Sequence, residues 1–135
     1  MKRLCLLFGL LVASGCGPSG PPKGTAHGKL TIGGKAPPFP VAVIFVNPSQ
    51  GLALGGATKE DGTYQLDGEV KAGDYTVYLE KVVNSDGPVS TSKNVLHIVP
   101  KEYRTEDASP LKKTLKEGDN EIDIDVPELE AAEKK

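Results

Sequence analysis

The sequence predicts an all-β protein, built as a single antiparallel β-sandwich of seven strands. Short segments in which apolar and polar residues alternate recur along the chain, as in 27–32, 74–80 and 120–126. This period of two is typical of strands with one buried face. Clusters of glycine, proline and aspartate separate the segments, and the chain has 16 Gly and 11 Pro among its 135 residues. No segment after residue 24 has a convincing helical period, so the strands are expected to pack as two sheets.

The first 15 residues predict an export signal. Lys2 and Arg3 form a positive head, and residues 4–13 are an apolar run broken only by Gly9. This run is about half the roughly 20 residues that a helix needs to cross a bilayer. A short apolar run between a positive head and small residues is the pattern of a signal peptide. We therefore expect residues 1–15 to be removed from the mature protein.

Cys16 is the predicted lipidation site. The segment 12–16, VASGC, resembles a bacterial lipobox, which implies a diacylglyceryl group on Cys16, cleavage just before it and acylation of the new amino terminus. Gly17 is not the aspartate that marks inner-membrane retention, and this favours the outer membrane. A Cys5–Cys16 disulfide and a free thiol are the alternatives. Cleavage before Cys16 removes Cys5 and with it the disulfide.

The chain divides into four predicted parts. After the signal peptide, residues 16–24 form a lipid-anchored tether rich in glycine and proline, a composition that does not pack into a core. The sandwich is predicted over 25–127. The polar segment 128–135 is predicted to be a C-terminal tail.

The first half of the domain contains three predicted strand regions. Residues 27–32 alternate, and residues 41–46, VAVIFV, are apolar on both faces, which is typical of a central strand covered on both sides. The segment 56–66 predicts a hairpin. Its Asp61-Gly62 pair supplies the positive φ that a tight turn needs.

The second half contains two alternating segments and a short apolar one. Residues 74–80 and 120–126 alternate strictly, whereas 95–99 is predicted as a short strand. The polar residues 84–93 predict a loop, and 101–113 show no clear period. The side chains predicted to point into the core are Leu30, Ile32, Tyr75, Val77, Leu79, Ile122, Ile124 and Val126.

Four segments occur in an order that resembles a known module. GKLTIGGKAPPFPVAVIFV (28–46), GATKEDGTYQL (56–66) and KAGDYTVYLEKV (71–82) resemble the strands and hairpin of carboxypeptidase regulatory-like domains. The close of the domain, VPKEYRTEDASPLKKTLKEGDNEIDIDV (99–126), is similar to the ending of many uncharacterised lipoproteins of planctomycete-type bacteria. With the lipobox, the resemblance covers about 26–126.

This resemblance implies both a fold and a role. The fold is a transthyretin-like, Ig-like sandwich, and the domain is non-catalytic, because such modules usually serve as folding aids or adhesion surfaces. The chain is therefore expected to be lipid-anchored on the extracytoplasmic side of the cell membrane or outer membrane. Its expected partners are the membrane, through Cys16, and an envelope protein. No cofactor is expected.

Acidic residues near the end of the domain are candidate ligands for a divalent cation. Glu121, Asp123 and Asp125 alternate, so they share one outward face about 7 Å apart, with Asp119 nearby. Charges on a strand face are more often solvated and keep an edge from aggregating. The alternative function is accordingly a small-ligand module for a divalent cation or a glycan.

Composition and motifs argue against several other classes. A formal net charge of −2 does not favour nucleic-acid binding, and the absence of tryptophan disfavours a sugar platform built on ring stacking. His27 and His97 are the two histidines, and neither has a Cys or His neighbour at the spacing of a zinc site. No G-x-S-x-G motif or other nucleophile–base pair is identifiable, so no enzyme is predicted.

Overall fold

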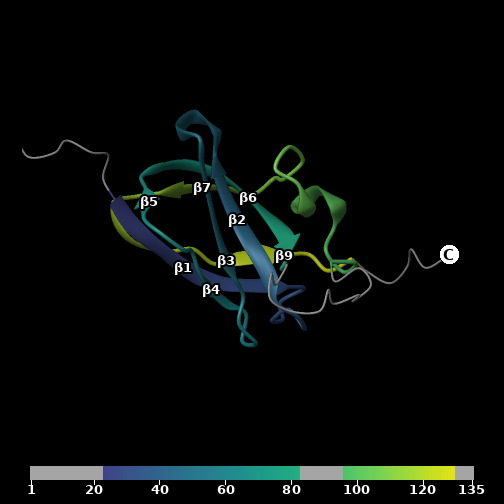
Figure 1. Cartoon of the computed structure of the whole chain (residues 1–135). Coiled ribbons are helices and arrows are strands. Elements are labelled where there is room, and N and C mark those ends of the chain that lie inside the picture. Colours follow the sequence, from purple (N-terminus) through teal and green to yellow (C-terminus); the bar gives the residue numbers. More distant parts are fainter. Residues whose placement is uncertain (1–22, 83–95, 130–135) are drawn as a thin grey trace, which may run out of the picture.

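The computed structural model describes residues 23–82 and 96–129, which form an all-β domain of two sheets (Figure 1). The predicted all-β class is confirmed. The strands are β1 Lys23–Ile32, β2 Val41–Asn47, β3 Leu52–Ala57, β4 Thr63–Gln65, β5 Val70–Lys71, β6 Gly73–Lys81, β7 Lys112–Leu115, β8 Gly118–Glu121 and β9 Ile124–Val126. Two short 3-10 helices, η1 Pro48–Gln50 and η2 Lys101–Arg104, complete the secondary structure of the two described ranges.

Three predictions fall on other parts of the chain. The signal peptide 1–15, the lipidation of Cys16 and the loop 84–93 lie outside the described residues. Within 23–82 and 96–129, no helix combines the length and the apolar composition that crossing a membrane requires.

β1 is the central strand of the first sheet. β4 and β5 pair antiparallel with one of its edges, and β8 and β9 pair parallel with the other. The parallel pairing corrects the expectation of an antiparallel sandwich. Alternation shows which face of a strand is buried, but it carries no information on strand direction. Here the chain leaves β7 in the second sheet and crosses to the first through Lys116 and Glu117 before β8 begins.

The second sheet is antiparallel throughout, in the order β3-β2-β6-β7. β2 pairs with β3 on one side and β6 on the other along nearly its whole length. The count of nine strands in the described residues differs from the predicted seven. One reason is that the predicted strand 120–126 is divided into β8 and β9.

Sixteen apolar residues form one core between the sheets. The predicted inward side chains are confirmed. Seven of the eight are buried, and Ile122, where the chain passes from β8 to β9, is half-buried and packs against the core. Phe45 lies near the centre, and its ring centroid is 6.3 Å from those of both Tyr64 and Tyr75. Tilted rings at this separation are a favourable arrangement for aromatic pairs.

The tight turn predicted at Asp61-Gly62 is confirmed. Gly62 has a φ of 83°, and the Asp61 carboxylate accepts hydrogen bonds from the Thr63 backbone N–H at 2.9 Å and its hydroxyl at 2.6 Å. These bonds lower the pKa of Asp61. The flanking strands do not form the predicted hairpin, because β3 pairs with β2 and β4 pairs with β1. The turn instead joins the two sheets.

Two segments of the second half differ from their predictions. Leu96–Ile98 form a turn, closed by a 3.0 Å bond from Val99 N to Leu96 O, where a strand over 95–99 was expected. Val99 is nevertheless fully buried in the core, so this apolar segment packs against the domain without pairing in a sheet. β7 begins at Lys112, inside the stretch 101–113 that shows no clear period, and only its last residue, Leu115, is fully buried.

The described domain extends past both predicted limits. β1 begins at Lys23, inside the predicted tether, and Leu129 N donates to Ile98 O at 2.8 Å, inside the predicted tail. Gly24 explains the first difference. A Cβ at this position would lie 2.0 Å from Gly118 O, so the glycine is needed for close strand pairing and does not mark a flexible segment.

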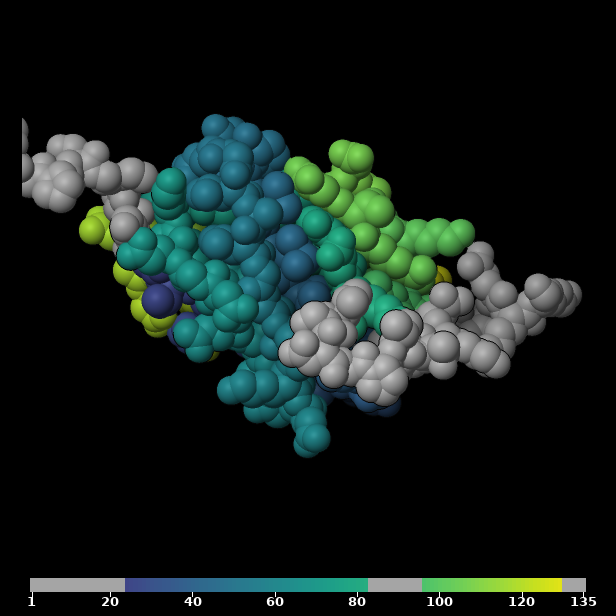
Figure 2. Space-filling model, in the orientation of Figure 1, coloured from purple at the N-terminus to yellow at the C-terminus, as the bar shows by residue number. Residues whose placement is uncertain are grey.

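β2 is covered on one face only. Val41, Val43 and Phe45 are fully buried, whereas the alternate residues on the other face are half-buried. This corrects the expectation of a strand covered on both sides. Figure 2 shows the molecule with β2 and β3, coloured blue to teal, at the front and residues 96 onward, in green, beside them.

Candidate functional site

Polar side chains of β1 face the carboxylates of β8 and β9 along the outer surface of the first sheet. Thr25 donates its hydroxyl hydrogen to Asp119 at 2.8 Å, and Thr31 donates to Asp125 at 2.6 Å. β8 and β9 run parallel to β1, so every second residue of β1 lies beside every second residue of its partner strand. We call this row of contacts the β1 polar ladder. Its members are Thr25, His27, Lys29 and Thr31 on β1, and Asp119, Asp123 and Asp125 opposite.

The histidine of the ladder forms an ion pair. His27 Nε2 lies 3.0 Å from Asp119 Oδ2, with 43% and 67% of the two side chains exposed. The Asp119 carboxylate, through its hydrogen bond and its charge, raises the pKa of His27, and Glu121 and Asp123 add to the effect. The same hydrogen bond lowers the pKa of Asp119.

This pair predicts a pH dependence of stability. Because the folded-state pKa of His27 is raised, its contact stabilises the fold fully below the ordinary imidazole pKa of about 6.5 and is lost as the pH rises through the raised value. The lowered pKa of Asp119 removes the contact at the acidic end, below its ordinary value of 3.8. The free energy of unfolding, measured with urea, should therefore decrease as the pH rises from about 6.5 through the raised pKa of His27. His27→Gln should lose this decrease. An equal decrease in both proteins would contradict the assignment.

The backbone pairing of β1 is interrupted between β8 and β9, and side chains there replace the missing backbone hydrogen bonds. Ile122 N donates to His27 O at 2.7 Å, but the next β1 amide, Lys29 N, donates to the Asp123 carboxylate at 2.9 Å. Ile122 O accepts from the Tyr64 hydroxyl at 2.6 Å. Gly28 makes this possible, because a Cβ there would lie 1.9 Å from Ile122 O.

Tyr64 is a core residue whose hydroxyl reaches the segment between β8 and β9. Its side chain is 3% exposed, and burial, followed by the charge of Asp123, raises its pKa well above the usual value. The phenol therefore remains a hydrogen-bond donor across the whole neutral range. Within the described residues, the phenol donates to the Ile122 carbonyl, to which β1 offers no amide.

Tyr64→Phe should lower the free energy of unfolding by about 1–2 kcal/mol, because it leaves the partly buried Ile122 carbonyl without its donor. Urea unfolding followed by circular dichroism measures the difference. Tyr78→Phe, on the outer face of the second sheet, is the matched control and should change stability by less than about 0.5 kcal/mol. Equal losses in both variants would show that the bond to Ile122 has no special role.

The buried side chain of Asn120 holds the start of β8 in place through hydrogen bonds to the backbone. Its carboxamide nitrogen donates to the carbonyl oxygens of Thr25, Lys116 and Gly118 at 3.0, 2.9 and 3.2 Å. Its oxygen accepts from Lys116 N at 2.8 Å. The side chain is 8% exposed. One amide therefore closes the turn after β7 and joins it to β1, which sets the register of the ladder.

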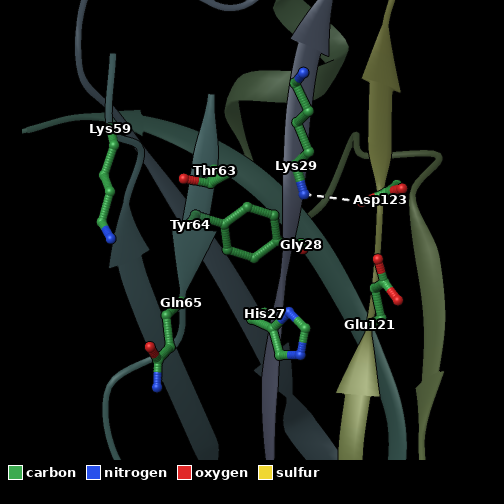
Figure 3. Close-up of a pocket in the computed structure, with 9 residues that line it drawn as sticks. All are labelled: His27, Gly28, Lys29, Lys59, Thr63, Tyr64, Gln65, Glu121 and Asp123. Carbon is green, nitrogen blue, oxygen red and sulfur yellow. Dashed lines mark hydrogen bonds between the residues drawn. The ribbon is translucent and has the colours of Figure 1, made fainter. Parts of the chain in front are cut away.

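A shallow groove of about 430 Å³ lies beside the ladder, across β4, β1 and the β8–β9 interruption (Figure 3). In the figure, Lys59 stands on the β4 side and Glu121 and Asp123 stand on the opposite side, with Gly28 and the ring of Tyr64 between them. The lining residues are His27, Gly28, Lys29, Lys59, Thr63, Tyr64, Gln65, Glu121 and Asp123.

The predicted cation ligands are exposed, as expected, but they lie in a row. Asp123 and Asp125 each give one oxygen to a donor on β1, and Glu121 lines the groove. Residues 23–82 and 96–129 contain no group of three or more His, Cys, Asp or Glu side chains placed to hold a metal ion. His27 belongs to the ladder, whereas His97 lies in the turn 96–98.

The sequence did not single out Tyr64, Asn120 or Gly28 as parts of this site. Alternation indicated the acidic face correctly. The donors opposite it, on β1, belong to residue types that are common in any strand, so nothing marked them as part of a site. The available signal was the matching alternation of polar residues in 25–31 and 119–125. It becomes informative only when the two segments are known to pair.

Comparison with known proteins adds no assignment. No protein-family model matches the chain, and no curated protein matches it either. The relation to carboxypeptidase regulatory-like domains therefore rests on the quoted segments and stays a proposal.

Proposed function

We propose that this chain is a lipid-anchored, non-catalytic protein of the cell envelope whose β-sandwich binds a partner protein. The observation that carries the binding role is the half-exposed apolar face of β2. Ala42, Ile44 and Val46 share this face, and each is only half-buried. Contiguous exposed apolar surface on a soluble domain usually marks an interaction site.

The strands on either side of β2 extend this surface. Ile44 lies between Gly55 of β3 and Tyr78 of β6, and Val46 lies opposite Ala53. The end of the Ile44 side chain would be 3.0 Å from a Cβ on Gly55, so this side chain lies over the glycine. We call Ala42, Ile44, Val46, Ala53 and Tyr78 the β2 outer face. Its apolar surface suits a partner protein that presents an apolar surface of its own.

The start of β1 supports the anchored arrangement. Lys23 stands at one end of β1, and the turn at Gly62 lies near the other end, where Leu30 N donates to Gly62 O at 2.8 Å. Cys16 precedes Lys23 by seven residues, which span at most about 25 Å when extended. An anchor on Cys16 would thus keep the domain close to the membrane. A partner protein beside the domain could still reach both sheets.

The test is photo-cross-linking in intact cells that make the full-length protein. A photoreactive residue replaces Ile44 on the β2 outer face or, as the matched control, the exposed Thr25 on the other sheet. We expect a discrete adduct with one envelope protein from position 44 and none from position 25. Cys16→Ser should release the protein from the membrane fraction and abolish the adduct.

Each arm of this experiment can overturn one part of the proposal. Equal cross-linking from both positions would reject the β2 outer face as the binding surface. Retention of the Cys16→Ser protein in the membrane fraction would reject the lipid anchor. Recovery of the unaltered protein as a soluble, unacylated chain would reject the anchor as well.

A further inference from the structure

The groove beside the β1 polar ladder is lined by polar groups that the described residues leave without partners. The side chains of Lys29, Lys59, Gln65 and Glu121 make no hydrogen bond or ion pair with any residue of 23–82 or 96–129. Asp123 uses one carboxylate oxygen for Lys29 N, so its second oxygen remains available. Such groups, gathered from three strands, are the usual means by which a pocket orients a small ligand.

The charges of the groove are separated, and those of its lysines and carboxylates balance. Lys29 and Lys59 contribute two positive charges, and Glu121 and Asp123 contribute two negative charges. His27, which also lines the groove, is paired with Asp119 when it is protonated. A simple anion would meet the carboxylates, and a simple cation would meet the ammonium groups. A ligand with no net charge but with opposite charges at its two ends is favoured by this field.

The position of the charges sets the length of the ligand. Lys59 lies beside β4, because its N–H donates to Thr63 O at 2.8 Å, whereas Glu121 ends β8 on the far side of β1. Neighbouring strands are about 4.8 Å apart, so the two walls are separated by about 10 Å. An extended peptide advances about 3.5 Å per residue. The groove therefore suits two or three residues with both termini free.

The floor of the groove fits a peptide backbone as well. The backbone of Gly28 lies at the floor of the groove, between the two walls (Figure 3). The Gln65 amide, on the β4 side, offers both a donor and an acceptor, which are the groups that a peptide bond needs. The Tyr64 ring offers no stacking surface to a ligand, because the residue is only 3% exposed.

We infer that this groove binds a short zwitterionic peptide, with the peptide carboxylate toward Lys59 and its ammonium group toward Glu121 and Asp123. The site lies on the first sheet and uses none of the residues of the β2 outer face. It is therefore an addition to the proposed function, and its failure would leave the cross-linking result unaffected.

The test is a titration of the full-length, ¹⁵N-labelled protein by NMR with three probes of similar size. Glycylglycine carries both charges, N-acetylglycylglycine carries only the negative charge, and glycylglycine amide carries only the positive charge. We expect glycylglycine alone to shift the amide signals of Gly28, Thr63 and Gln65 along saturable curves. Equal shifts with all three probes, or none with glycylglycine, would overturn the inference.

Charge-removing variants locate the two ends of the peptide. Lys59→Gln and Glu121→Gln should each weaken glycylglycine binding by about two- to fivefold, the range for an exposed ion pair. Glu60→Gln, which alters the same turn without touching the groove, is the control and should bind as the unaltered protein does. The amide spectrum of each variant reports whether it is folded. Unchanged binding by a folded Glu121→Gln protein would contradict the assigned orientation.

Discussion

Gly28→Ala is expected to destabilise the protein by about 3 kcal/mol, the upper end of the range for overpacking a well-packed site. The added Cβ would stand 1.9 Å from Ile122 O and 2.5 Å from Ile122 C, and both are backbone atoms that cannot rotate away. β1 and the chain between β8 and β9 must then separate. This separation breaks the 2.7 Å bond from Ile122 N to His27 O and the bond from Tyr64 to Ile122 O. Urea unfolding measures the loss.

Gly55→Ala is the matched control for this prediction. Gly55 also lies in a strand and is not at positive φ, but its added Cβ would approach only the end of the Ile44 side chain, at 3.0 Å. Because alanine also restricts the unfolded chain more than glycine does, the change should be within about 1 kcal/mol of zero. Similar losses at positions 28 and 55 would show that the close approach of Ile122 is not the cause.

Asn120→Asp is the second substitution with a large expected effect, although it changes the side-chain shape very little. The new carboxylate would face the carbonyl oxygens of Thr25, Lys116 and Gly118, which now accept from the Asn120 amide. The lost donors and the partly buried negative charge should together cost about 3 kcal/mol at pH 7. Thermal or urea unfolding of the two proteins at equal ionic strength gives the difference.

The pH dependence of this variant identifies the cause. The carbonyl oxygens raise the pKa of the new carboxyl group in the folded state, so the penalty is fully present above that raised value and shrinks as the pH falls toward about 4. Asn47→Asp is the control. Asn47 is also buried, at 3% exposure against 8% for Asn120, but its side-chain oxygen accepts from Gln50 N, a role that aspartate also performs. If Asn47→Asp lost as much stability, with the same pH dependence, burial alone would explain both results.

The sequence predicted the all-β class and most of the core because both depend on alternation within a single strand. Tyr75, Val77 and Leu79 on β6 are buried as expected, and Gly62 makes the expected turn. Features that depend on which strands become neighbours were not predicted. The parallel pairing of β1 with β8 and β9 and the exposure of one β2 face belong to this group.

The candidate site shows the same division. Alternation placed Glu121, Asp123 and Asp125 on one outward face, where the structure also has them. It gave no indication that Asp123 bonds to Lys29 N, because the two residues are 94 positions apart in the chain. The glycine-rich start of β1 was predicted as tether for a related reason. Gly24 is needed only because Gly118 lies against it.

The parallel edge of β1 also has a consequence for how the chain folds. The central strand of the first sheet is among the first parts of the domain to be made, and its partners on one side, β8 and β9, are among the last. Contacts between such distant segments require closure of a long loop, which slows folding. If the chain is exported as its first residues predict, the first sheet cannot be completed until β9 has emerged. The domain would then remain unfolded, with its central strand exposed, throughout its passage.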